Sequence, residues 1–162
     1  MKIYLALYRQ GGTFDALIKW WTRTAYSHAA LCYGQMHRKD LKIEALLTGV
    51  RQAKLEDYPG NWIIDCLELP DIPEDLHTEI WEEARKYLGR KYDFKGVLSF
   101  LWKYFRQNPE AFFCSELIET VLGKFGLNCC EKSPWKVIPA DLASSSRTVK
   151  IKTLTKRGFD GY

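Results

Sequence analysis

The sequence predicts an α+β fold in one domain, residues 1–162. Its first part carries short apolar segments with the two-residue alternation of strands, and later apolar positions recur at helical spacing. Strands first and helices later favour α+β over a parallel, doubly wound sheet, in which the two kinds of element alternate. A second domain would be cramped in 162 residues.

Six strands are expected. The first is apolar on both of its faces, which places it at the centre of a sheet. The last is indicated by the alternating residues Val149, Ile151 and Thr153 near the C-terminus. The expected strands cover residues 2–9, 28–33, 42–47, 49–55, 62–69 and 149–153.

Five helices are expected. Thr13 is a candidate N-cap for the first, and Pro70 and Pro73 break the chain before the second, which has one apolar face. Pro139 is tolerated in the first turn of the last helix. The expected helices cover residues 13–23, 74–88, 94–106, 114–124 and 139–144.

One cysteine stands where a thiol can be activated. Cys114 follows Phe112 and Phe113, whose segment is interpreted as extended, and it opens a helix for which Gly126 is the C-terminal stop. Free amides and the helix dipole stabilise negative charge at a helix start, and the thiolate is the nucleophilic form of cysteine. Cys114 is therefore a candidate nucleophile, and an inert core cysteine is the alternative.

Two earlier strands carry the groups that a thiol nucleophile requires. Alternation places His28, Ala30 and Cys32 on one face of their strand. Glu44 lies inside an apolar strand, where a buried acid needs a partner. Cysteine, histidine and an orienting polar group are the parts of a thiol hydrolase. The alternatives are a structural histidine and an edge-strand acid that faces water.

These residues resemble the circularly permuted NlpC/P60 branch of the papain-like cysteine hydrolases, which includes YiiX-type and lecithin–retinol-acyltransferase-like proteins. In that branch the histidine strand precedes the cysteine helix, as it does here. Each motif is short, but six occur in the family's order between residue 1 and about residue 145. The matching segments are 2–9, 14–24, 26–28, 43–45 with 49–50, 89–96 and 113–117.

The resemblance implies a fold and a mechanism. The fold would be a permuted papain-like NlpC/P60 fold, in which an antiparallel sheet or barrel packs against helices that include the nucleophile helix. Cys114 would be the nucleophile, His28 the general base and then the acid, and Glu44 the group that orients the imidazole. Tyr92 matches the family tyrosine near the oxyanion site, where the amide of Cys114 could also donate. Neither a metal nor another cofactor is expected.

Three functions follow as alternatives. The first, which the sequence favours, is a thiol hydrolase that cleaves a peptide or isopeptide amide, or an ester, through an acyl-enzyme. The second is a lipid-dependent acyltransferase with the same chemistry, and the third is a non-catalytic papain-like binding module. Intact Cys114, His28 and Glu44 argue against the third. The expected partner is a peptide, isopeptide or lipid acyl substrate.

Composition argues against several other classes. The net charge of +4 is mild and no nucleic-acid-binding motif accompanies it, so no nucleic-acid partner is expected. Five irregularly spaced cysteines without a Cys-x-x-Cys pair argue against a disulfide framework and a structural zinc site. No transmembrane-length apolar run and no signal peptide is apparent, so the expected location is cytoplasmic, or reached without a signal peptide. The sequence does not predict an oligomeric state.

Overall fold

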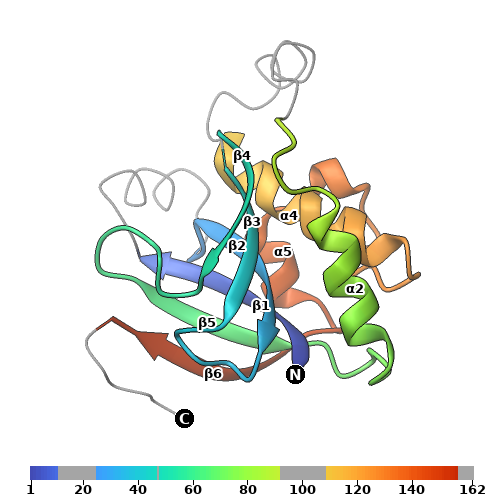
Figure 1. Ribbon diagram of the computed structural model, residues 1–162, viewed down its shortest axis with the longest axis horizontal. Helices are drawn as coiled ribbons and strands as arrows, with labels where there is room; N and C mark the ends of the chain where they lie inside the picture. Colours follow the sequence, from blue (N-terminus) through green and yellow to red (C-terminus); the bar gives the residue numbers. More distant parts are fainter. Residues whose placement is uncertain (11–24, 47, 92–108, 157–162) are drawn as a thin grey trace.

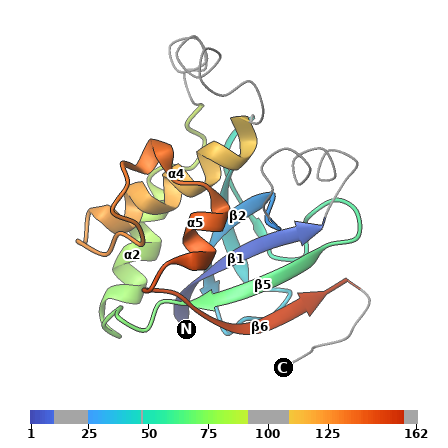
Figure 2. The ribbon, with the colours of Figure 1, turned by 180° about the vertical axis from the view of Figure 1, so that it is seen from behind.

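The computed structural model describes residues 1–10, 25–46, 48–91 and 109–156. These parts form an antiparallel sheet of six strands with helices packed against one of its faces (Figures 1 and 2). The α+β architecture predicted from the order of the elements is therefore confirmed. The helices expected over 13–23 and 94–106, together with Tyr92, lie outside the described residues.

The sheet has the strand order β4-β3-β2-β1-β5-β6. Every neighbouring pair is antiparallel. The first strand lies inside the sheet, as its two apolar faces predicted, with Leu5 and Ala6 both fully buried. The observed bounds, which differ from the expected ones by two residues at most, are β1 Lys2–Gln10, β2 His28–Gly34, β3 Leu41–Leu46, β4 Gly49–Lys54, β5 Ile63–Glu68 and β6 Val149–Thr155.

The described helices are α2, α4 and α5, together with the short 3-10 helix η1. The helix expected over residues 74–88 is shorter than predicted, because residues 86–89 form a turn. Pro139 begins α5 as expected. None of the helices in the described ranges is long and apolar enough to span a bilayer. Their bounds are α2 Leu76–Arg85, α4 Pro109–Gly123, η1 Pro134–Lys136 and α5 Pro139–Ser144.

The helix that carries Cys114 begins earlier than the sequence predicted. α4 starts at Pro109, a residue type favoured in the first helical turn, so the two residues before Cys114 are helical and not extended. Counted from Pro109, Cys114 is the sixth residue. Its amide lies beyond the four free N–H groups of a helix start, and the dipole effect fades after the first turn. The expected helix start at Cys114 is therefore wrong. A helix start cannot be what activates the thiol, and the Cys114 amide is not one of the free N–H groups that could donate to an oxyanion.

The end of the same helix agrees with the prediction. α4 ends at Gly123, and Gly126 adopts a left-handed φ of 69°, which a residue without Cβ tolerates. The N–H of Leu127 donates back to the carbonyl oxygen of Leu122 at 3.0 Å. This bond satisfies one of the terminal carbonyl groups that a helix leaves without partners.

Apolar side chains cover both faces of the sheet. On one face, β1 side chains such as Leu5 pack with Ile118 and its apolar neighbours in α4. On the other face, Tyr4 and Tyr8 of β1 pack with side chains of β2 and β5. Each large apolar side chain buried in this way contributes about 1.5–3 kcal/mol. Since α4 packs directly on β2 and β3, it brings Cys114 to the strands that carry His28 and Glu44.

Candidate active site

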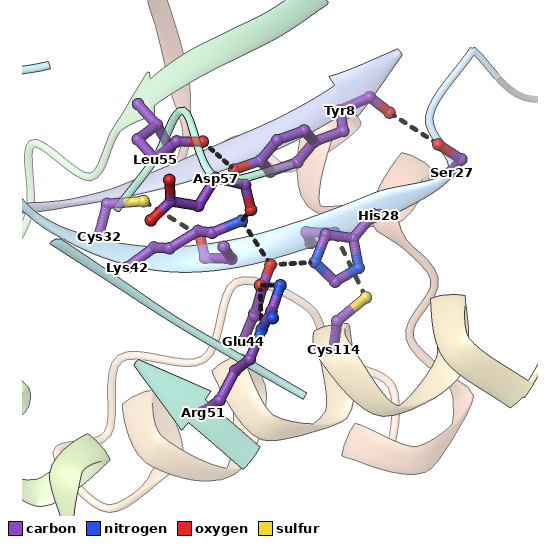
Figure 3. A network of polar contacts seen from close by, with 12 residues as sticks. Tyr8, Ser27, His28, Cys32, Lys42, Glu44, Arg51, Leu55, Asp57 and Cys114 are labelled. Atoms are coloured by element: carbon purple, nitrogen blue, oxygen red, sulfur yellow. Dashed lines mark hydrogen bonds and ion pairs between the residues drawn. The ribbon is translucent and has the colours of Figure 1, made fainter. Parts of the chain in front are cut away.

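Three residues predicted from separate segments meet where α4 packs on the sheet (Figure 3). Cys114 comes from α4, His28 is the first residue of β2, and Glu44 lies in the middle of β3. All three are buried, with exposed fractions of 1%, 2% and 1%. The fold therefore places a thiol, an imidazole and a carboxylate together in a region sheltered from solvent.

The His28 ring connects the carboxylate with the thiol. Its Nε2 lies 2.8 Å from Oε2 of Glu44, and its other nitrogen, Nδ1, faces the Cys114 sulfur (Figure 3). The ring of Tyr58 stacks on the imidazole at 5.3 Å, and the ring of Tyr8 lies 5.4 Å away at a tilt. These contacts fix the orientation of the ring, so that one nitrogen is available to each neighbour.

The acid does not face water. Glu44 belongs to β3, which lies between β2 and β4, so the alternative of an edge-strand charge is wrong. The expected contact between Glu44 and His28 is present. As alternation predicted for β2, Ala30 and Cys32 point to the face that also carries Tyr8, the ring beside His28.

A backbone N–H group of a neighbouring strand contacts the thiol, whereas the sequence predicted that the amides of a helix start would stabilise it. The N–H of Ala29 donates to Sγ of Cys114 at 3.3 Å. A hydrogen bond to the charged form of a group favours that form, so this contact stabilises a thiolate. No local pattern predicts this contact, because the amide belongs to β2 and reaches the sulfur only through the packing of α4.

Glu44 has two further partners that sequence reasoning missed. Nζ of Lys42 lies 2.7 Å from Oε2, and the guanidinium of Arg51 contacts Oε1 through Nε at 2.9 Å and Nη2 at 2.8 Å. Strand alternation could have placed Lys42 on the face of Glu44, two residues away. The β3–β4 register puts Arg51 directly opposite Glu44, a position that the short turn between these strands could have indicated.

The electrostatic environment keeps both members of the His28–Glu44 pair charged. Burial alone would raise the pKa of Glu44, but His28 and Lys42 outweigh it and lower that pKa from 4.5 to about 2. Burial alone would lower the pKa of His28, yet Cys114 and then Glu44 raise it from 6.5 to about 9. Near neutral pH an imidazolium therefore faces an ionised carboxylate on one side and the Cys114 sulfur on the other.

The remaining cysteines have environments that disfavour the thiolate. Burial raises the pKa of Cys130 to about 11 and that of Cys66 to about 12, and it raises the pKa of Cys32 and Cys129 well above the ordinary range. All five cysteines are free thiols. Only the thiolate is strongly nucleophilic, so these four cysteines are poor nucleophiles near neutral pH.

Comparison with known proteins identifies a fold and no sequence family. No protein-family model matches the chain, and no curated protein matches it in sequence. One similar solved structure is the metalloprotein YiiX from Escherichia coli O157:H7, DUF1105, with a TM-score of 0.64 and 16% sequence identity. The likeness covers 93% of this chain and 96% of that chain. The chain therefore has a YiiX-like fold.

The groups around Cys114 do not suit a metal ion, although YiiX is described as a metalloprotein. In the described ranges, no three or more His, Cys, Asp or Glu side chains are arranged to hold one. Each oxygen of Glu44 already accepts from a cation, Oε2 from Lys42 and Oε1 from Arg51. These fixed positive charges would repel a metal ion at the same carboxylate.

Proposed function

We propose that this chain is a thiol hydrolase of the permuted papain-like NlpC/P60 type. It cleaves a peptide or isopeptide amide, or an ester, through an acyl-enzyme on Cys114. The observation that carries the proposal is the buried series Cys114, His28 and Glu44, in which one ring nitrogen faces the thiol and the other lies 2.8 Å from the carboxylate. The YiiX-like fold supports it.

The first half-reaction forms a thioester. The reaction starts from an ion pair in which the imidazolium of His28 carries the proton on Nδ1 and Cys114 is the thiolate, which the imidazolium and the N–H of Ala29 stabilise. The sulfur attacks the substrate carbonyl carbon to give a tetrahedral intermediate. This intermediate collapses with cleavage of the C–N or C–O bond, and the imidazolium returns its proton to the departing amine or alcohol.

The second half-reaction regenerates the enzyme. Neutral His28 takes a proton from water through Nδ1, and the resulting hydroxide attacks the thioester carbonyl. Collapse of the second tetrahedral intermediate breaks the C–S bond, releases the carboxylic acid and leaves the Cys114 thiolate beside the imidazolium that formed when water was deprotonated. Glu44 keeps its negative charge throughout, because its pKa is about 2, and it orients and stabilises the imidazolium.

A rapid-quench labelling experiment tests the proposal. The protein is mixed with a small activated ester, quenched in acid and digested, and its peptides are analysed by mass spectrometry. A small reagent suits a thiol that is only 1% exposed, because access requires its surroundings to open. We expect an acyl adduct on the Cys114 peptide, none on that peptide in Cys114→Ala, and an undiminished yield in the control Cys130→Ala.

The fate of the adduct separates the alternatives. Prompt release by water supports the hydrolase, whereas slow release by water and fast release by a lipid alcohol or an amine would show the acyltransferase. If no ester or amide in a panel forms an adduct on Cys114, the result would favour the third alternative, a non-catalytic binding module. Treatment with a chelator should not change the rate, and complete loss that zinc restores would contradict the thiol mechanism.

A further inference from the structure

Glu44 is held by more positive charge than the orientation of a histidine requires. One hydrogen bond from Nε2 of His28 is enough to fix the imidazole, yet Lys42 and Arg51 bind the same carboxylate. The Lys42 side chain is 0% exposed. A fully buried lysine is rare and costly in free energy unless it is paired, so its presence at this position calls for a physical role.

Lys42 and His28 occupy one enclosure. Both contact the same atom, Oε2 of Glu44, at 2.7 Å and 2.8 Å. The rings of Tyr8 and Tyr58 flank both groups, with Nζ of Lys42 at 4.9 Å and 5.2 Å from their centroids. Because the side chains of His28 and Lys42 are only 3% and 0% exposed, the lysine charge acts on the imidazole with little screening.

The charges of Glu44 and its two cationic partners do not cancel. Ionised Glu44 contributes one negative charge, whereas Lys42 and Arg51 contribute two positive ones, so the three groups together carry one positive charge. A buried carboxylate alone would hold a proton on His28 strongly. Two fixed cations on that carboxylate oppose this effect, because each also repels the imidazolium.

We propose that Lys42 and Arg51 form a cation clamp on Glu44: they are positioning residues that fix the carboxylate and limit how strongly it holds the proton on His28. The electrostatic part of the clamp does not depend on any activity. Its catalytic consequence rests on the proposed function, since the imidazolium must give its proton to the leaving group and the neutral ring must accept one from water.

Titration of His28 tests the clamp directly. The chain has three histidines, so nuclear magnetic resonance of histidine-labelled protein can follow His28 beside His37 and His77. We expect Lys42→Met to raise the pKa of His28 by about 1 unit or more, since it removes a buried cation. Arg51→Gln should raise it by a smaller amount, because the Arg51 side chain is 48% exposed.

Three controls separate the clamp from a general loss of structure. Arg51→Lys keeps the charge and should leave the titration unchanged. Lys54→Met removes an exposed lysine of β4 and should also have no effect. The His77 signal should stay constant in every variant, because this residue contacts the backbone of Ile3 through its Nδ1 and lies away from the enclosure.

Other titratable groups also face His28. They are Cys114 of α4, Glu44 and Lys42 of β3, Tyr8 of β1, and Tyr58 after β4. The titrations are therefore repeated in a Cys114→Ala background, which removes the nearest thiol. The burial of Tyr8 raises its pKa well above 10 and keeps it neutral over the range used.

The clamp is wrong if the His28 pKa is unchanged or falls in folded Lys42→Met and Arg51→Gln proteins. Should Lys42→Met fail to fold, the pair Arg51→Gln and Arg51→Lys decides, since Arg51 is half exposed. This readout is independent of the adduct on Cys114. A normal titration shift without an adduct would refute the proposed function alone, and an adduct without a shift would refute the clamp alone.

Discussion

Glu44 and Asp65 are buried carboxylates in the same sheet, and their partners differ in kind. Glu44 of β3 contacts three nitrogen-bearing side chains, one of which is a histidine. Asp65 of β5 is held by two cations and two hydroxyl groups. Its partners are Arg9 at 2.9 Å, Lys150 at 3.0 Å, Tyr26 at 2.8 Å and Thr153 at 2.6 Å.

The two sites serve different ends. The partners of Asp65 come from β1, β6 and the segment before β2, so this carboxylate links separate parts of the sheet. Burial followed by the hydrogen bond to Asp65 raises the pKa of Tyr26 to about 12, so this partner stays neutral near neutral pH. Glu44 instead contacts a group that titrates beside a thiol. Both carboxylates are therefore buried and paired with several groups. What distinguishes Glu44 is its contact with His28, a side chain that can change its protonation state.

Substitution of the two acids should give the largest contrast. Glu44→Gln is expected to lower kcat about 100-fold or more in the folded enzyme, because a neutral amide no longer stabilises the imidazolium. Asp65→Asn should lower the free energy of unfolding by about 1–2 kcal/mol, since it weakens the hydrogen bonds and half-exposed ion pairs of a buried carboxylate, with kcat of the folded fraction unchanged. Ester turnover and urea unfolding measure the two effects. Equal losses of kcat in both variants would remove the distinction between the sites.

Alkylation should show a smaller contrast among the thiols. At mildly acidic pH, iodoacetamide is expected to modify Cys114 before the other four cysteines, whose thiolates burial disfavours. His28→Gln should slow the labelling of Cys114 by about tenfold or more, because the imidazolium is lost, while Asp65→Asn should leave it unchanged. Peptide mapping over time gives the rates. Uniform labelling, or no effect of His28→Gln, would contradict an activated thiolate.

The pH dependence of stability should also distinguish the two carboxylates. The pKa of His28 rises on folding from 6.5 to about 9, so its contribution is complete below pH 6.5 and is lost as the pH rises to about 9. The slope is at most about 1.4 kcal/mol per pH unit for one proton. Urea unfolding between these pH values should show this loss in the wild type and not in His28→Gln.

Asp65 provides the control for that measurement. Burial alone would raise its pKa, but Thr153 and Lys150 outweigh burial and lower it from 3.8. Its contribution is therefore complete above pH 3.8 and is lost only in acid. The stability difference between the wild type and Asp65→Asn should stay constant from pH 6.5 to 9. If the stability difference between the wild type and Asp65→Asn instead falls over this range as much as the difference between the wild type and His28→Gln does, the alkaline loss does not come from His28.

Local sequence patterns were sufficient to predict the strands and the candidate residues. Two-residue alternation is a local property, because successive side chains of a strand point to opposite faces, and it placed all six strands to within two residues. An acid in an apolar strand and a histidine at a strand start were recognisable for a similar reason: each is a polar group that burial would oblige to find a partner. Cys114, His28 and Glu44 could therefore be named before their positions in space were known.

The environment of these residues depends on contacts between segments that are distant along the chain. The pairing of β3 with β4 brought Arg51 to Glu44, and the packing of α4 on β2 brought the N–H of Ala29 to the sulfur. The start of α4 at Pro109 removed the local argument for an activated cysteine, since a helix start depends on signals that compete over several residues. Charges that meet across strands shift a pKa through distance and burial, which spacing along the chain does not contain.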